Sequence, residues 1–229
     1  MPSQSSLRVL IVIAAYNEAE VIGRVIADVK RRGYLPVVID DGSRDNTGRA
    51  AGAAGAVVLR HPINLGQGAA LQTGIEYALR HDTDYIVTFD ADGQHRAQDI
   101  AGLLAALDRH GADFALGSRF LGATIDLPFS RRILLKAATW FTCLTTGLHL
   151  SDTHNGLRAM TRRGASRISL RQNRMAHASE FLDQIARSGL SWVEVPVTVE
   201  YTAYSLAKGQ TLGDSLAILV DLSTQRLHR

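Results

Sequence analysis

The chain has 229 residues and a formal net charge of +3, from 25 Lys and Arg against 22 Asp and Glu. Hydrophobic residues make up 46% of it and charged residues 21%, as in ordinary soluble globular domains. Its single cysteine, Cys143, excludes an internal disulfide and suits a reducing compartment. No apolar run reaches the roughly 20 residues that a membrane-spanning helix needs, and the polar start predicts no signal peptide. These features favour one globular domain in the cytoplasm.

The first half of the chain alternates short apolar runs with helical patterns. The runs predict strands at 7–14, 37–39, 56–59, 85–89 and 114–116. The helical patterns between them cover 18–30, 45–54, 67–80 and 98–110, and several are followed by glycine, at positions 33, 55 and 111. Repeated strand–helix units predict an α/β fold, with a mostly parallel sheet flanked by helices on both faces.

The second half of the chain is less regular. Its patterns predict, in order, a Gly- and Pro-punctuated loop at 122–128, a helix at 130–146, a strand at 157–160, a helix at 178–188, a strand at 192–201 and an amphipathic helix at 211–227. Pro196 indicates that the last strand lies at the edge of the sheet, because proline cannot donate a ladder hydrogen bond.

The most informative stretch of the sequence follows the fourth apolar run. Asp90 and Asp92 stand one residue apart where that run ends, and residues two apart on a strand point to the same side. Two carboxylates and the amide of Gln94 offer the hard oxygen ligands that suit Mg²⁺ or Mn²⁺. Such a metal would neutralise a departing diphosphate. An acidic turn that merely ends a buried strand would carry the same residues. The residues after the other predicted strands are therefore needed to distinguish a metal site from such a turn.

Polar clusters follow the other four predicted strands as well. They are the segments 15–18, 40–43, 64–68 and 117–119. Because ligands bind beyond the carboxyl ends of the strands in an open parallel sheet, five clusters at one edge predict a ligand site there. A dinucleotide fingerprint fits poorly, since Gly66-Gln67-Gly68 follows the third strand and not the first, and no P-loop pattern is present.

Taken in order, these motifs resemble the family-2 glycosyltransferases of the GT-A fold over nearly the whole chain. Tyr16-Asn17-Glu18 is similar to the family's opening motif, Asp40-Asp41-Gly42-Ser43 to its nucleoside-binding turn and Asp90-Ala91-Asp92 to its metal-binding motif. Segments 117–120, 152–158, 194–197 and 201–210 most resemble the branch that glycosylates polyprenyl phosphates, including dolichol-phosphate mannosyltransferases. The chain departs from the family at Ala14, usually Pro, and at Gln67, often Lys, and lacks the C-terminal membrane helices common in this branch.

The resemblance implies a single GT-A domain over 1–229, with a nucleotide-sugar half at 1–120 and an acceptor half at 121–229. It implies that Tyr16 and Glu18, with Asp40 or Asp41, hold the base and ribose of a nucleoside-diphosphate sugar, and that Asp90, Asp92 and Gln94 hold the metal. The strand-end residues Ala14, Gln67 and Ala91 complete the expected donor site. Candidates to grip the acceptor phosphate are Arg119 and one or both of Arg131 and Arg132; the pair at 131–132 could equally form a solvated helix face. Lys208 could reach a phosphate from a mobile loop and is counted with the donor-binding residues, or it could simply be exposed.

The implied reaction is an inverting transfer of a hexose to a polyprenyl phosphate in bacterial-type cell-surface glycan synthesis. A phosphate monoester is already mostly ionised at neutral pH, whereas a sugar hydroxyl needs a base, for which Asp152 and Glu180 are the candidates. Two alternatives remain: extension of a glycan on a sugar hydroxyl, and a non-catalytic nucleotide-sugar-binding scaffold.

A lipid acceptor implies peripheral attachment to the inner face of the membrane, beside a small membrane-protein subunit as a further candidate partner. The expected contacts are the segment 133–150, the Arg-rich stretch 158–174 and the C-terminal helix. Nucleic acid is not expected, because no aromatic residues interleave the basic ones. His95, His154 and His177 form no zinc pattern and are predicted to be turn or surface residues.

Overall fold

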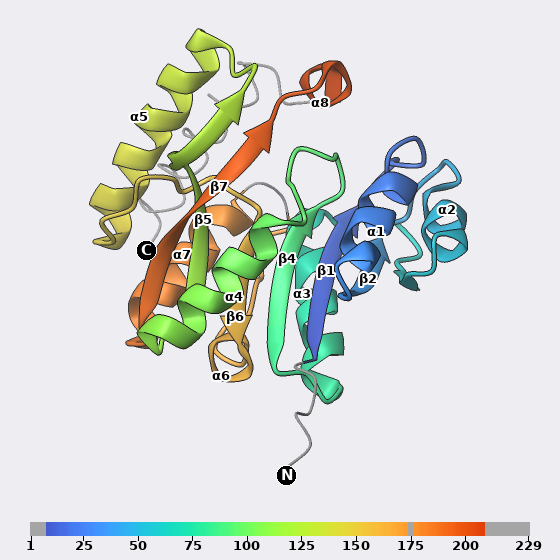
Figure 1. Cartoon of the computed structure of the whole chain (residues 1–229), viewed down its shortest axis with the longest axis horizontal. Helices are drawn as coiled ribbons and strands as arrows, with labels where there is room; N and C mark the ends of the chain where they lie inside the picture. Colours follow the sequence, from blue (N-terminus) through green and yellow to red (C-terminus); the bar gives the residue numbers. More distant parts are fainter. Residues whose placement is uncertain (1–7, 174–175, 209–229) are drawn as a thin grey trace.

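The structure is a computed structural model that describes residues 8–173 and 176–208. These residues form a seven-stranded sheet between two layers of helices, with the strand order β3-β2-β1-β4-β6-β5-β7 (Figure 1). The strands are β1 (Val9–Ala15), β2 (Leu35–Asp40), β3 (Val57–Arg60), β4 (Tyr85–Asp90), β5 (Phe114–Ile125), β6 (Arg158–Thr161) and β7 (Trp192–Glu200). All paired strands are parallel except β6, which runs antiparallel to both its neighbours. The predicted α/β class is confirmed.

Helices cover both faces of this sheet. Within the described ranges they are α1 (Ile22–Arg31), α2 (Thr47–Ala53), α3 (Gln67–Arg80), α4 (Asp99–His110), α5 (Phe129–Thr146), α6 (Arg162–Ala165), α7 (His177–Ser188) and α8 (Ala203–Lys208). Ile11 and Ile13 of β1 pack with α1 and α4, whereas Leu10 and Val12 pack on the other face with α3 and α7. Because both faces of β1 are buried, its sequence is a continuous apolar run.

The second half of the sheet corrects one prediction. β5 continues to Ile125 after an irregularity between Ser118 and Ala123, so residues 122–125 belong to a strand and not to the predicted loop. A Cβ on Gly122 would lie 2.2 Å from the carbonyl oxygen of Val197, so glycine serves here for close backbone approach and not for a turn. β7 pairs with β5 at the end of the sheet, which confirms the edge predicted from Pro196.

Some predictions for the C-terminal part of the chain fall outside the described residues. The predicted amphipathic helix at 211–227 lies outside the described residues, as do 209 and 210 of the segment 201–210. α8 ends at Lys208, whose side chain is also outside the description. Within the described ranges, no helix combines the length and the apolar character that crossing a membrane requires.

The sheet gathers distant residues at one edge. In the pairing register Ala15 stands beside Asp40, and Ala14 beside Asp90, at the carboxyl ends of β1, β2 and β4. Because β6 runs in the opposite direction, its first residue, Arg158, pairs with Thr88 at this same edge. Residues from 14 to 158 in the sequence therefore surround one opening.

Candidate active site

A pocket of about 580 Å³ lies beyond this edge of the sheet. Donor-half residues on its wall are Ala14, Ala15, Tyr16, Glu18, Asp41, Asn64, Gly66, Gln67, Ala70, Leu71, Thr88, Asp90, Ala91 and Asp92. Acceptor-half residues on its wall are Arg131, His154, Asn155, Gly156, Arg158, His177 and Ala178. Most of the residues expected at the donor site thus share one cavity, to which the acceptor half contributes two arginines and two histidines.

Asp90 sits at the centre of the pocket, at the end of β4. His95 Nε2 lies 3.0 Å from its Oδ2, and Gln67 Nε2 donates to its Oδ1 over 3.4 Å. Burial by itself would raise the pKa of Asp90, but the hydrogen bond with His95 and the charges of His95, Arg158 and His177 hold it below its ordinary value. Asp90 is therefore ionised at neutral pH.

The absence of a side chain at Gly156 leaves space for the carboxylate of Asp90. A Cβ built on Gly156 would lie 2.1 Å and 2.3 Å from the two carboxylate oxygens of Asp90. The carbonyl of Gly156 also accepts a hydrogen bond of 2.7 Å from the hydroxyl of Thr88, which ties this loop to β4. Any side chain at position 156 would displace the carboxylate or the loop.

Asp92 also lines the pocket, and the charge of Asp90 affects its pKa. Burial and the charge of Asp90 raise the pKa of Asp92 to about 6, although its Oδ1 accepts a 3.0 Å hydrogen bond from the backbone N–H of Gln94. Two crowded carboxylates form a site where a cation would be stabilised, and Mg²⁺ or Mn²⁺ bound to nucleotides commonly takes one or two carboxylates plus phosphate oxygens. The donor set therefore fits the expected metal.

Gln94 contributes differently from the prediction. It does not line the pocket, and the described residues hold no cluster of three acidic, histidine or cysteine side chains of the kind that binds a metal without substrate. The backbone carbonyl of Gln94 accepts from Glu200 N over 2.9 Å, and Arg96 forms a 3.3 Å ion pair with Glu200. These contacts fasten the turn after Asp92 to the end of β7, which fixes where the aspartates point.

On the donor side, Asp41 organises a loop. Its carboxylate accepts from the backbone N–H groups of Leu65 and Gly66, over 2.9 and 2.7 Å, and lies 2.7 Å from Nδ1 of His61. Asp40 is buried away from the pocket wall, where it accepts a 2.9 Å hydrogen bond from Ser43 N. Of the two expected aspartates, only Asp41 faces the cavity.

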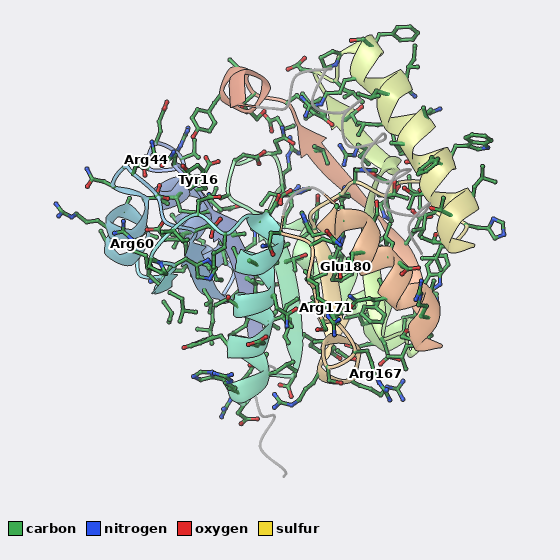
Figure 2. All side chains as sticks on the ribbon, turned by 180° about the vertical axis from the view of Figure 1, so that it is seen from behind. Tyr16, Arg44, Arg60, Arg167, Arg171 and Glu180 are labelled. Atoms are coloured by element: carbon green, nitrogen blue, oxygen red, sulfur yellow. The ribbon has the colours of Figure 1, made fainter. Side chains whose placement is uncertain are left out.

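The opening motif lies at the mouth of the pocket. Tyr16 is 38% exposed, and Figure 2 shows it near Arg44, far from Glu180. Glu18 lines the cavity, and its Oε2 accepts a 2.7 Å hydrogen bond from the hydroxyl of Tyr204. Tyr204 belongs to α8, so the C-terminal end of the described chain closes over this wall.

Arg158 is a buried arginine among the acceptor-half residues that line the pocket. Its Nε donates to the carbonyl of Asn155 over 2.9 Å, and its guanidinium carbon lies 4.6 Å from the centre of the Phe181 ring. Burial lowers the pKa of Arg158 to about 10, against the opposing charges of Asp90 and Asp152. It remains positive at neutral pH, and its charge helps to lower the pKa of Asp90. Arg158 was expected among the lipid contacts of the stretch 158–174, which is wrong for this residue because it is buried in the pocket wall.

The structure places Arg119 behind the pocket wall, not on it. Arg119 is buried; its Nε donates to Asp152 over 2.6 Å, its Nη1 to the hydroxyl of Tyr201 over 2.6 Å, and its Nη2 to the carbonyl of His154. Every nitrogen of the guanidinium is thus engaged within the protein. The geometry does not bring Arg119 to an acceptor phosphate, contrary to the expectation from sequence.

Arg119 instead supports a residue that does line the cavity. Arg119 donates to the hydroxyl of Tyr201, and the ring of Tyr201 lies under Arg131, whose guanidinium carbon is 5.3 Å from the ring centre. Arg131 lines the pocket, whereas its neighbour Arg132 is exposed and does not. Arg131 is therefore positioned to contact a ligand, whereas Arg132 lies on the solvated face of the helix.

Neither candidate base reaches the pocket. Asp152 is buried and accepts from Arg119 and from the backbone N–H of His154, over 3.2 Å. Glu180 accepts from the backbone N–H groups of Arg171 and Gln172, over 3.0 and 2.8 Å, and so holds a loop (Figure 2). Both carboxylates have a structural role, because each accepts hydrogen bonds from donors that would otherwise be unpaired.

The Arg-rich stretch does not form one surface. β6 carries the chain from Arg158, at the pocket, to the opposite edge of the sheet. There Arg162 donates to the carbonyl of His81 over 2.8 Å, and Arg163 forms a 2.6 Å ion pair with Asp113. Arg174 lies outside the described residues. The described part of the stretch thus divides between the two ends of the sheet.

The three histidines are also placed differently from the prediction. His95 and His177 are buried, and His154 and His177 line the pocket. Burial, with the nearby charges of Arg119 and Arg158, lowers the pKa of His154 to about 4 against the opposing effect of Asp152. For His154, the position between Asp152 and the glycine and arginine of the segment 152–158 was a signal in the sequence that pointed to the site.

Comparison with known proteins identifies the family. The model of glycosyl transferase family 2 matches residues 10–168, well over half of the chain. The chain belongs to this family. An uncharacterized protein of Methanocaldococcus jannaschii is 36% identical over 96% of this chain and 92% of its own length. The recognition of family 2 from the motifs is confirmed.

Two named relatives resemble the chain over most of its length. UDP-N-acetylglucosamine–dolichyl-phosphate N-acetylglucosaminyltransferase of Methanococcus voltae is 30% identical over 88% of this chain and 89% of its own, and polyprenol monophosphomannose synthase of Mycolicibacterium smegmatis is 31% identical over 91% and 83%. Glucosyl-3-phosphoglycerate synthase from Mycobacterium tuberculosis, solved with Mn²⁺, UDP-glucose and phosphoglyceric acid, superposes with a TM-score of 0.73 at 19% identity, over 93% of this chain and 76% of that chain. The GT-A fold is confirmed, while the comparisons give no support for a membrane-protein subunit.

Proposed function

We propose that this chain is an inverting transferase that moves a hexose from a nucleoside-diphosphate sugar to a polyprenyl phosphate, with Mg²⁺ or Mn²⁺ as its metal. The observation that carries the proposal is one cavity lined both by an aspartate pair and by Arg131, Arg158 and two histidines. Such a site balances a diphosphate and metal on one side and a second anion on the other. The relatives named for dolichyl phosphate and polyprenol support this acceptor.

The donor half, residues 1–120, supplies the groups for the nucleotide. Tyr16 offers an aromatic face at the mouth of the pocket, and Glu18 lines the wall beside it. Asp41 fixes the loop that carries Gly66 and Gln67 through its hydrogen bonds to Leu65 and Gly66. A prepositioned loop saves the ordering cost that a mobile one would add to donor binding.

Asp90 and Asp92 would hold the metal. A bound divalent cation supplies positive charge that stabilises the departing diphosphate. The protein's own part is to keep both carboxylates close together: Gly156 leaves room for Asp90, and the link between Gln94 and Glu200 fixes the turn behind Asp92. His95, at 3.0 Å from Asp90, helps to keep that carboxylate ionised.

The acceptor half, residues 121–229, favours a phosphate over a sugar hydroxyl. The two carboxylates expected to serve as a base, Asp152 and Glu180, are both bound within the protein. A hydroxyl acceptor needs such a base, whereas a phosphate oxygen can attack without losing a proton. Arg131 and Arg158 would position the phosphate so that its oxygen approaches the anomeric carbon opposite the diphosphate. The new C–O bond forms as the bond to the diphosphate breaks, with inversion.

One assay tests the proposal. The full chain is incubated with radiolabelled nucleotide sugars and Mn²⁺, with undecaprenyl phosphate, with a soluble oligosaccharide, or with neither. Transfer to the lipid phosphate, abolished by EDTA and restored by Mn²⁺, is the expected result. Transfer to the oligosaccharide alone would replace this proposal by glycan extension, and donor binding without any turnover would indicate a scaffold.

A further inference from the structure

α5 leaves large apolar side chains exposed. The residues that it buries most deeply are Thr139 and Thr142, and Thr139 Oγ1 accepts a 3.3 Å hydrogen bond from the hydroxyl of Thr153. Leu134, Leu135 and Phe141 are half-buried, whereas Phe129 is 77% exposed, Ile133 55%, Trp140 67% and Leu144 65%. A helix on the surface of a soluble domain normally buries its apolar stripe and exposes its polar one.

The four exposed residues share one side of the helix. Phe129, Ile133, Trp140 and Leu144 are spaced at i, i+4, i+11 and i+15, which places them in one stripe, and exposed Lys136 lies on the same side between Ile133 and Trp140. Figure 1 shows α5 along the outer side of the molecule, with β5 and β7 on its inner side. Leu121, on β5, is a further exposed apolar residue, at 53%. Several large apolar side chains exposed on one side of a helix indicate an interaction site.

The charges on α5 are all positive. Arg132 and Lys136 are exposed on it, and the helix contains no Asp or Glu. Lys136 lies 5.8 Å from the centre of the Phe120 ring. Basic side chains next to exposed Trp, Phe and Leu are typical of helices that lie in the interface of a membrane containing anionic lipids.

We propose that α5 docks this protein on an anionic bilayer through the stripe of Phe129, Ile133, Trp140 and Leu144. The choice of a bilayer as the apolar partner rests on the proposed function, because a polyprenyl phosphate resides in one. α5 also carries Arg131, which lines the pocket two residues after Phe129. A helix lying in the headgroup layer would therefore hold the acceptor wall of the pocket at the depth of a lipid phosphate.

Flotation of the full chain with vesicles tests the proposal. Vesicles of phosphatidylcholine alone are compared with an equimolar mixture of phosphatidylcholine and phosphatidylglycerol. We expect binding to the anionic vesicles that weakens about tenfold or more in Leu144→Ser, because that change removes one inserted leucine. The matched control is Leu35→Ser, the same change at a 55% exposed leucine at the start of β2. Equal binding of the two variants, or no flotation of the wild type, would overturn the proposal.

Tryptophan fluorescence gives a second, direct readout. The chain has two tryptophans, and Trp192→Phe leaves Trp140 as the sole reporter. On adding anionic vesicles, its emission should shift to the blue and be quenched by brominated lipid. Trp140 that is shielded from acrylamide before any lipid is added would mean that the stripe is already covered. Analytical ultracentrifugation would then show what covers the stripe. A dimer would indicate a second copy of the chain, and a monomer would indicate residues 209–229. Either result contradicts the proposal.

The two proposals fail separately. Transfer to a water-soluble short-chain prenyl phosphate, without vesicle binding, would keep the proposed function and remove the docking surface. Vesicle binding through α5 without any sugar transfer would keep the surface and remove the function. Leu144→Ser should retain transfer to the short-chain acceptor, since Leu144 does not line the pocket.

Discussion

Arg119 donates through Nε to Oδ2 of Asp152 over 2.6 Å, and both side chains are almost fully buried. The same aspartate accepts from the backbone N–H of Arg119 over 3.0 Å. The pair thus joins β5 to the segment that precedes β6. Two residues expected to meet the substrate instead satisfy each other, and they position the wall that carries His154 and Arg131.

Arg119→Lys is therefore expected to act on stability. Lysine keeps the charge but cannot reach Asp152, Tyr201 and the His154 carbonyl together, so the free energy of unfolding should fall by about 2–4 kcal/mol. Urea unfolding followed by circular dichroism measures the change, with Arg109→Lys on the exposed side of α4 as the control. Wild-type stability combined with a raised KM for lipid phosphate would restore the direct role for Arg119.

Gly156→Ala should lower kcat about 100-fold and leave the fold intact. The added Cβ would collide with the Asp90 carboxylate, and a displacement of about 1 Å there is enough to lower kcat about 100-fold. Gly102→Ala is the matched control, because the nearest atom to a Cβ at that position of α4 is 3.8 Å away. Steady-state kinetics and circular dichroism of both variants check the prediction; an active Gly156→Ala would show that Asp90 tolerates movement.

Asp92→Asn should weaken the stabilisation of the protein by Mn²⁺ with a nucleoside diphosphate. Removing one carboxylate lowers the negative charge that attracts the metal, and turnover should fall on the order of 100-fold. The rise in melting temperature on adding Mn²⁺ and UDP or GDP measures binding without catalysis. Asp82→Asn, at an exposed ion pair with Arg8, should behave as wild type. A full thermal shift in Asp92→Asn would count against the metal site.

His154 should make the fold sensitive to acid. Its pKa falls from 6.5 to about 4 in the folded chain, so the unfolded chain binds the proton more readily between these values. Stability is therefore fully present above pH 6.5 and decreases as the pH falls toward 4. His154→Gln should reduce this dependence, while His110→Gln, at the exposed end of α4, should not. The midpoint of urea unfolding is measured for each protein across this pH range. If the midpoints of the wild type and of His154→Gln change with pH in parallel, His154 is not the source of the acid sensitivity.

The sequence by itself determined the order of strands and helices in the first half of the chain. β1, β2 and β4 are buried on both faces, so each appears as a continuous apolar run, and the polar residues after them mark the carboxyl edge. Asp90 and Asp92 could be read from the sequence because their geometry is local: both residues follow one strand, and nothing distant is needed to bring them together.

Only the tertiary structure decided which of the other charged residues face the cavity. Arg119 points inward because Asp152 and Tyr201, 33 and 82 residues further along the chain, offer it partners. Arg158 reaches the pocket because β6 runs antiparallel to β4, a direction that no local pattern encodes. Glu180 and Arg132 are residue types that are common in such sites, but neither lines the pocket. Local patterns determine where strands end, whereas long-range pairing determines which side chains are left to bind a ligand.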